Sequence, residues 1–258
     1  MTSPSHTPAP HEPGDVRREL VATWALCIGG LAVAKLVSLV EPTGLLAGNL
    51  AGVAAFLFIA LPERKIHPRG ERWSDHGLPW WGAVDARTWR AWGRGFAVAL
   101  GVCALVFPLF FVVFWAYGQL FSFLPPWLAA LIAPYALPPS PSFQLPPRFA
   151  LAVAVQVLVI ALPEELFYRG WMQGRWARTD RARGVRVLGA RLGTGFFATQ
   201  ALFALGHLVI LQPWRLATFI PGVLFGWLRE RTGGIAVPVF VHALSNLFIA
   251  VLEASYYG

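Results

Sequence analysis

Charged residues are scarce in this chain. Asp, Glu, Lys and Arg make up only 13% of the 258 residues, whereas 56% are hydrophobic. Soluble domains carry about 25% charged and about 45–50% apolar residues, so the composition excludes an ordinary soluble domain. Several apolar runs approach the roughly 20 residues that a helix needs to cross a hydrocarbon core of about 30 Å. The sequence therefore predicts an integral membrane protein.

Cysteine is nearly absent as well. The two cysteines, Cys27 and Cys103, both lie inside apolar runs. They offer neither a metal-ligand spacing nor a disulfide framework. We expect both to pack as small apolar residues within helices.

Acidic residues are fewer than basic ones, 13 against 21, which gives a net charge of +8. Basic clusters can mark a nucleic-acid-binding protein. Here the Arg and Lys residues lie between apolar segments, which is the positive-inside pattern of membrane proteins. We therefore expect the positive charge to interact with the lipid bilayer, and we expect no nucleic-acid partner.

The apolar runs predict an all-α, polytopic membrane protein with about seven transmembrane helices and an intramembrane catalytic cavity. The sixth helix is short and is expected to borrow residues from the turn that follows it or to tilt. The predicted spans are 20–40, 45–61, 95–117, 149–173, 192–211, 216–228 and 235–252.

The chain divides into three parts. Residues 1–18 are rich in Pro, Ser, Thr and His and are expected to form a disordered cytoplasmic tail. Residues 19–148 hold the first three spans, a basic loop with several Trp residues, and a Pro-rich stretch that is expected to cap the outer face. Residues 149–258 form the predicted catalytic core.

The charge of the loops predicts an orientation. Basic residues concentrate in the loops 62–94 and 174–191 and at Arg229 and Arg231, whereas the loops 41–44, 118–148 and 212–215 contain only Arg148 and Arg215. Positive-inside bias then places the N-terminus in the cytoplasm and the C-terminus outside. Seven crossings require the same result.

A few polar residues lie where the bilayer interior is expected. A charge at mid-bilayer costs about 2.5–3.5 kcal/mol on insertion scales, so such residues are candidates for function. Glu164 and Glu165 lie inside the fourth span, and His207 and His242 are the histidines that fall within spans. These four residues define the predicted site.

Helical spacing assigns them provisional roles. Arg169 follows Glu165 by four residues, the spacing of a favourable ion pair, so Glu165 is expected to be structural and Glu164 to be the free carboxylate. Pro163 precedes Glu164 and is expected to kink the helix at the site.

Two further four-residue spacings add to the site, because residues four apart share one face of a helix. His242 pairs with Asn246 in the seventh span, and Phe203 with His207 in the fifth. Glu164 and His207 could then deprotonate a water, while His242 and Asn246 donate hydrogen bonds to an oxyanion. Alternatively, Glu164, His207 and His242 could bind Zn²⁺ with a water as fourth ligand. The sequence leaves both versions open.

The same residues resemble a known family. Glu164-Glu165 with Arg169 matches EExxxR, Phe203 with His207 matches FxxxH, and His242 with Asn246 matches HxxxN, in the order found in the CPBP family of intramembrane endopeptidases, which includes the CAAX prenyl proteases. The likeness covers about residues 150–250. It implies a helical membrane fold in which Glu164 and His207 handle the water and His242 and Asn246 support the oxyanion. Family members are described as glutamate-type and as metal-dependent proteases.

The resemblance also bears on substrate and location. It implies a membrane-anchored protein or peptide as substrate, and nothing requires a prenyl group on it. The Arg-, Trp- and Pro-rich composition is typical of a high-GC bacterium, so the bacterial inner membrane is expected and a myxosortase-like member is one form that the resemblance allows. Two other classes stay open: a small proton-coupled transporter, and a non-catalytic scaffold or immunity protein.

Overall fold

The computed structural model describes residues 13–78, 86–120, 123–132, 141–179 and 184–257. Almost all described elements are helices, which confirms the all-α membrane class. Their bounds are α1 Pro13–Ser38, α2 Leu45–Gly48, α3 Leu50–Ile66, α4 Ala86–Leu120, α5 Pro126–Ile132, α6 Phe149–Val155, α7 Leu162–Glu165, α8 Gly174–Thr179, α9 Thr194–Gly206, α10 Phe219–Thr232 and α11 Ala236–Tyr257.

One continuous helical rod runs through the middle of the molecule and carries the predicted acidic motif. It consists of α6, α7 and α8 joined by two π-helical segments, Gln156–Ala161 and Leu166–Gln173. Pro163 lacks the N–H that would bond to the carbonyl one turn earlier, and the wider π-helical turn before it absorbs this mismatch. The expected disturbance at Pro163 therefore takes the form of π-helical turns on both sides of Glu164 and Glu165.

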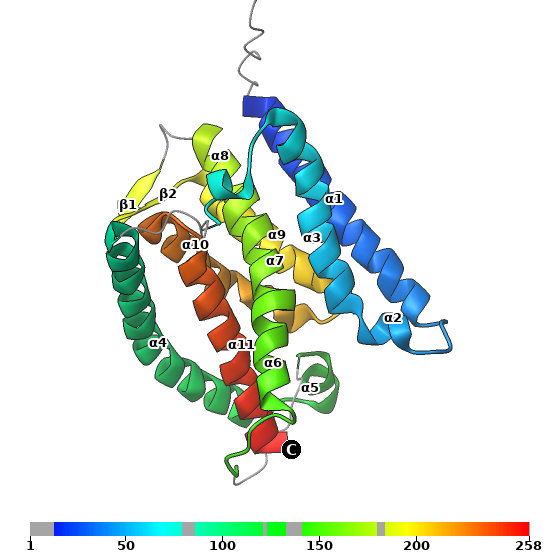
Figure 1. Cartoon of the computed structure of the whole chain (residues 1–258). Helices are drawn as coiled ribbons and strands as arrows, with labels where there is room; N and C mark the ends of the chain where they lie inside the picture. The colour runs from blue at the N-terminus through cyan, green and yellow to red at the C-terminus, as the bar shows by residue number, and fades with distance from the viewer. Residues whose placement is uncertain (1–12, 79–85, 121–122, 133–140, 180–183, 258) are drawn as a thin grey trace, which may run out of the picture.

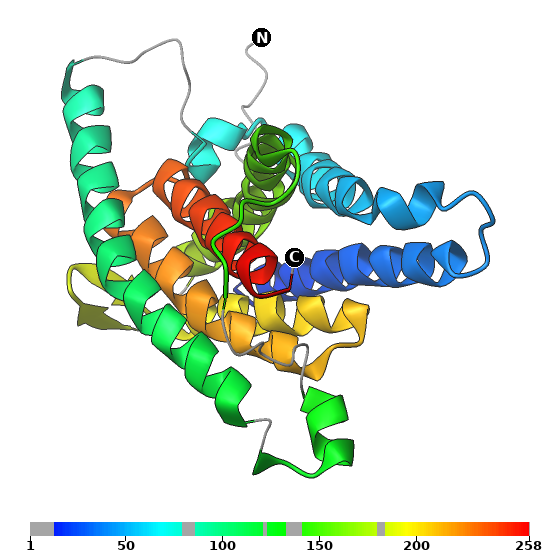
Figure 2. The ribbon, with the colours of Figure 1, turned by 90° about the horizontal axis from the view of Figure 1, so that it is seen from below.

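The other helices surround this rod (Figure 1). The α1–α3 hairpin packs on one side, α9, α10 and α11 pack close to the rod, and α4 bows around the far side of α10 and α11. The view from below shows the α1–α3 hairpin and α4 projecting from different sides of the central group (Figure 2). The beginning of α1 and the end of α11 lie at opposite ends of the molecule.

Two apolar clusters hold this arrangement. In the first, Phe58 of α3 lies 4.8 Å from Phe167 of the rod, ring centroid to ring centroid, and Tyr168 packs edge-on against Phe203 of α9 at 5.1 Å. The second joins α4, α10 and α11. Cys27 and Cys103 are buried, one in each cluster, and carry free thiols, as the sequence predicts.

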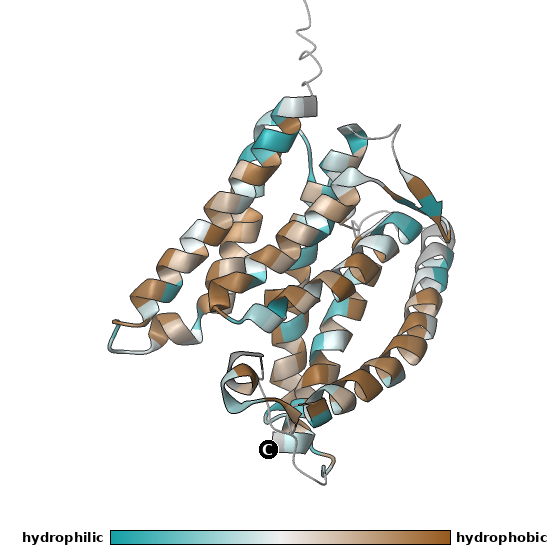
Figure 3. Ribbon diagram, turned by 180° about the vertical axis from the view of Figure 1, so that it is seen from behind, coloured by the Kyte–Doolittle hydropathy of each residue, from teal (hydrophilic) through white to brown (hydrophobic). Residues whose placement is uncertain are grey.

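Much of the helical ribbon consists of hydrophobic residues (Figure 3), and many of their side chains are exposed. Leu26 on α1 is 65% exposed and Leu105 on α4 is 74% exposed, along with many other large apolar side chains of these two helices. Such a continuous apolar surface is rare on monomeric soluble proteins and is the expected surface against lipid. The chain is therefore an integral membrane protein.

Helix length and apolarity together identify fewer crossings than the apolar runs of the sequence predict. Each of the seven predicted spans overlaps a helical stretch. Within the described residues, four stretches are long and apolar enough to cross a membrane: Gly14–Ser38, Gly93–Leu120, Phe149–Thr179 and Ala236–Tyr256. α3 ends in Glu63, Arg64 and Lys65, and α10 has only 14 residues. Seven crossings therefore stay a prediction.

Several boundaries differ from the predicted ones. α1 begins at Pro13, where a proline suits the first helical turn, so residues 13–18 are helical rather than part of a tail; residues 1–12 lie outside the described residues. α4 begins at Ala86 because helix-forming residues extend the apolar run into the basic loop. α10 continues to Thr232, as the shortness of the sixth span suggested, and ends at Gly233 with φ 77°.

The second basic loop contains a β-hairpin that we did not predict. β1 (Val185–Val187) pairs antiparallel with β2 (Ala190–Leu192). Leu188 and Gly189 connect them with φ angles of 47° and 87°, the positive pair that suits a two-residue hairpin turn. The Trp227 Nε1 group of α10 donates to the Val187 carbonyl at 3.0 Å and fixes the hairpin on the bundle.

The Pro-rich outer stretch is described only in part. Residues 121–122 and 133–140 lie outside the described residues, so the predicted cap is untested there. The described remainder contains α5 and an extended segment in which the Ser142 and Gln144 amides donate to the Ser255 carbonyl and hydroxyl oxygens, both at 3.0 Å. This segment therefore lies against the end of α11.

A short part of the first basic loop, residues 67–78, crosses the basic end of the rod, and we call it the strap. Its Gly77 carbonyl accepts from the Ile235 amide at 3.0 Å. Its His76 carbonyl packs on Gly170, where a Cβ would come within 2.9 Å of the oxygen. His76 is buried, and its Nε2 lies 2.8 Å from Glu71 Oε2. The strap thus fixes the end of the rod beyond the acidic motif.

The strap makes stability depend on pH. Burial lowers the pKa of the His76 imidazole, against the opposing hydrogen bond with Glu71. Below the unfolded pKa of about 6.5, the unfolded chain therefore binds a proton that the folded chain resists, and stability falls as the pH decreases. We expect the melting temperature of the detergent-solubilised protein to fall between pH 7.5 and pH 5 more steeply than that of His76→Gln. Equal slopes would contradict this.

Candidate active site

Two carboxylates and one imidazole meet at the centre of the bundle. Glu164 and Glu165 end α7, and His242 lies in the second turn of α11. His242 Nδ1 lies 2.8 Å from Glu165 Oε1, and His242 Nε2 lies 3.8 Å from Glu164 Oε2. The imidazole therefore stands between the two carboxylates.

Arg169 forms the ion pair that its spacing predicts. Its Nη1 lies 2.9 Å from Glu165 Oε1, and both side chains are fully buried. Its Nη2 donates to Gln200 Oε1 at 3.0 Å and to the Gly222 carbonyl at 3.1 Å. The guanidinium also lies 4.2 Å from the centre of the Phe203 ring. One side chain thus ties the rod to α9 and α10.

The contact with Glu165 determines which ring nitrogen of His242 carries a proton. Glu165 is compensated by Arg169, and as a carboxylate it can only accept hydrogen bonds. His242 must therefore carry a proton on Nδ1, and its Nε2 is the atom that faces Glu164. The ring is held flat against Phe225, with centroids 4.7 Å apart and 19° between planes.

Glu164 differs from Glu165 in its hydrogen bonds: Glu165 Oε1 is bound by Arg169 and His242, although Glu165 Oε2 is buried without a donor, and no hydrogen bond to Glu164 is found in the described residues. Within the described part of the chain, its Oε2 is buried and accepts no hydrogen bond, and its side chain is 18% exposed. A buried carboxylate oxygen without a donor is costly unless water or a ligand supplies one. This is the free carboxylate that the sequence predicts.

His207 lies at the junction where α9 gives way to a 3₁₀ turn, His207–Ile210. Its Nδ1 lies 2.8 Å from the Phe203 carbonyl, which can only accept, so Nδ1 carries the proton and Nε2 is free to act as a base or ligand. Phe203 packs against both imidazoles, with ring centroids 4.7 Å from His207 and 6.1 Å from His242. In the described residues, no hydrogen bond or ion pair joins His207 to Glu164.

Asn246 lies on the His242 face of α11, as the spacing predicts. Its Nδ2 donates to Gln156 Oε1 at 2.9 Å, and Gln156 begins the first π-helical segment of the rod. The amide pair joins α11 to the rod. Sequence reasoning missed Gln156, although a glutamine inside an apolar span could have marked it.

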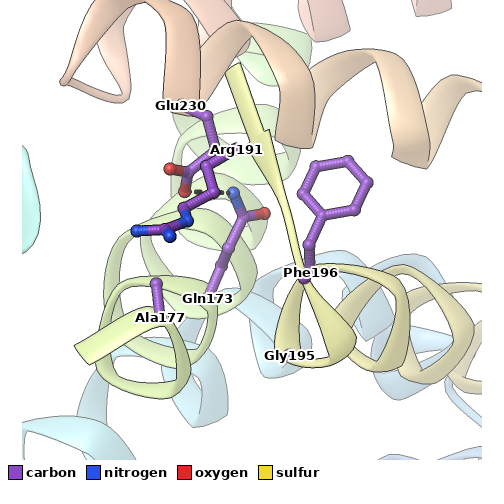
Figure 4. Close-up of a pocket in the computed structure, with 7 residues that line it drawn as sticks. Gln173, Ala177, Arg191, Gly195, Phe196 and Glu230 are labelled. Carbon is purple, nitrogen blue, oxygen red and sulfur yellow. Dashed lines mark hydrogen bonds between the residues drawn. The ribbon is translucent and has the colours of Figure 1, made fainter. Parts of the chain in front are cut away.

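A chain of buried side-chain amides continues from Arg169 to the basic end of the molecule. Gln200 Nε2 donates to Gln173 Oε1 at 2.9 Å, and Gln173 Nε2 donates to Glu230 Oε1 at 2.8 Å. Gly226 makes room for it, because a Cβ there would lie 2.6 Å from Gln200 Nε2. Gln173 and Glu230 line a cavity of about 30 Å³ beside Phe196 (Figure 4). No residue spacing in the sequence predicts this chain of side-chain amides.

The donor set fits a metal poorly. The predicted ligands are Glu164, His207 and His242, but the described residues contain no group of three His, Cys, Asp or Glu side chains arranged to hold an ion. His242 Nε2 faces Glu164, but His207 meets the cluster only through Phe203. We therefore derive no step through zinc.

The chain therefore belongs to the class of helical membrane proteins that hold a cluster of ionisable side chains among their helices. Residues 146–248 match the family model described as Type II CAAX prenyl endopeptidase Rce1-like. This segment is therefore an Rce1-like domain, which confirms the resemblance to the CPBP and CAAX proteases, and it contains all three motifs. No curated protein and no solved structure gives a significant match to the chain.

The ion pair makes a stability prediction. Arg169→Met leaves Glu165 buried without its cation, and breaking a buried pair from one side costs about 3–5 kcal/mol. We expect a strongly lowered melting temperature in detergent for this variant. Arg169→Met combined with Glu165→Gln should recover part of the loss, because no charge is then left unpaired. If Arg169→Met alone were as stable as the wild type, the structural role of the pair would be refuted.

Proposed function

We propose that this protein is an intramembrane endopeptidase that hydrolyses a peptide bond of a membrane-anchored protein or peptide, with Glu164 as general base. The observation that carries the proposal is that the Glu164 carboxylate lies 3.8 Å from His242 Nε2 and accepts no hydrogen bond in the described part of the chain, whereas Glu165 is bound by Arg169 and His242. The Rce1-like match over the same segment supports a protease.

The proposed reaction needs no group beyond these side chains and water. A water held by Glu164, with His207 Nε2 as a second acceptor, gives its proton to the Glu164 carboxylate while its oxygen bonds to the substrate carbonyl carbon. The negative charge moves to the carbonyl oxygen, which accepts hydrogen bonds from His242 and Asn246. When the C–N bond breaks, the leaving nitrogen takes the proton back from Glu164.

The proposed roles make demands on two of these residues. Donation from His242 Nε2 requires a proton on that atom as well as on Nδ1, and Glu164 is the neighbour that can exchange one with it. Asn246 must turn its amide from Gln156 Oε1 towards the substrate, or else hold Gln156 in place. His207 must approach the water through the space beside Phe203.

The general base can be tested in host cells. We expect cells that carry the wild-type protein to contain new protein termini in the membrane fraction, and cells that carry Glu164→Gln to lack them, because removal of a general base costs about 10²–10⁴-fold in rate. Terminal peptides are mapped by mass spectrometry, which also identifies the substrate.

The control is Glu63→Gln, which removes a carboxylate at the end of α3, away from the site. It should retain the wild-type termini at equal protein levels. Identical termini in wild type and Glu164→Gln would contradict the protease and favour a scaffold or a transporter.

The glutamic form of the mechanism has its own test. Because the predicted zinc ligands do not converge among the described residues, we expect treatment of the purified protein with EDTA to leave the rate of cleavage of the identified substrate unchanged. Loss of cleavage on chelation, restored by added Zn²⁺, would instead support the metal-dependent version.

A further inference from the structure

A polar cavity of about 310 Å³ opens at the basic end of the molecule, on the far side of the amide chain from the carboxylates. Three arginines from three elements line it: Arg178 of α8, Arg191 of β2 and Arg229 of α10. Asp75 of the strap and Glu230 of α10 are the acidic residues of its wall. The volume lies within the range of small-molecule sites.

The acidic residues of this cavity are already engaged, whereas the arginines are not. Glu230 Oε1 accepts from Gln173 Nε2 at 2.8 Å, and Asp75 Oδ2 accepts from the Arg72 amide at 2.8 Å. Within the described ranges, Arg178, Arg191 and Arg229 form no salt bridge, and Arg229 Nε is buried without any hydrogen bond. Arg229 is half-buried, whereas Arg178 and Arg191 are exposed, so the cost of desolvation without a partner falls on the Arg229 guanidinium.

The position of Arg229 is built into the fold. Gly77 turns the strap with φ 90°, and a Cβ at this residue would lie 3.1 Å from Arg229 Nη2. Gly174 of α8 leaves the opposite side open, with its Cβ position 3.9 Å from the same nitrogen. A side chain at residue 77 would therefore crowd the guanidinium, whereas Gly174 is in ordinary contact range of it.

We propose that Arg178, Arg191 and Arg229 form a binding site for a phosphate group. Guanidinium groups present forked donors that match phosphate oxygens, and charge-assisted hydrogen bonds of this kind are about twice as strong as neutral ones. The cavity lies at the end of the bundle where the basic segments gather, which the positive-inside pattern assigns to the cytoplasmic headgroup layer. The phosphate comes from a lipid headgroup or from free phosphate. The proposal does not depend on the proteolytic function.

The test uses the full-length protein, delipidated in neutral detergent. Dioctanoyl-phosphatidylglycerol and inorganic phosphate are titrated separately, and binding is followed by calorimetry and by native mass spectrometry. Dioctanoylglycerol, which has the same acyl chains but no phosphate, is the control ligand. We expect saturable binding of at least one phosphate compound and none of dioctanoylglycerol at this site. Binding of the lipid alone identifies a headgroup site, and binding of inorganic phosphate alone identifies a site for free phosphate.

The matched variants are Arg178→Gln with Arg191→Gln, and Arg64→Gln, which removes an exposed arginine of the same end of the molecule outside the cavity. The double variant should bind at least about tenfold more weakly, which corresponds to about 1.4 kcal/mol, and Arg64→Gln should bind as the wild type does. In phosphate-free detergent the double variant should melt no lower than the wild type, because it loses uncompensated charge. Absence of binding by both phosphate compounds, or equal weakening by Arg64→Gln, would overturn the proposal.

Discussion

The structure depends on one buried carboxylate. Glu165 Oε1 accepts from Arg169 Nη1 and lies 2.8 Å from His242 Nδ1, with no solvent exposure of the glutamate or the arginine. In a lipid environment no water can replace a missing partner, so each polar group must find its partners inside the protein. The positions of four elements follow from this requirement, because Arg169 also binds Gln200 of α9 and Gly222 of α10, and His242 brings in α11.

This requirement explains the division between the two adjacent glutamates. Glu165 has its charge compensated and its geometry fixed, so it orients the imidazole. Glu164 remains within reach of the other ring nitrogen and keeps a buried oxygen without a donor. Glu165 Oε2 is also buried without a donor. The two glutamates differ because Glu165 is bound through Oε1 by Arg169 and His242, whereas no hydrogen bond to Glu164 is found among the described residues. The general-base role that we propose for Glu164 therefore depends on what Glu165 already binds.

The sequence predicted the features that depend on local spacing. The apolar runs marked the long helical stretches but not the short α5 in the Pro-rich stretch. The four-residue spacing found the Glu165–Arg169 pair and the shared face of His242 and Asn246. It could not predict contacts between helices, such as His242 with Glu165 or Asn246 with Gln156, because these depend on how α11 rotates against the rod. The sequence also could not predict the position of His207, because the change to a 3₁₀ turn at that residue follows from packing rather than from helical period.

The amide chain has a direction, and that direction supports the site. From Arg169 to Glu230, each glutamine turns its oxygen towards the guanidinium and its N–H group towards the carboxylate. The two amide dipoles are therefore aligned between a cation and an anion, an arrangement in which each hydrogen bond polarises the next. Arg169 thereby binds Gln200 as well as Glu165, and Glu165 also accepts a hydrogen bond from His242. Without Gln200 and Gln173, Arg169 would keep only Glu165 and the Gly222 carbonyl as acceptors.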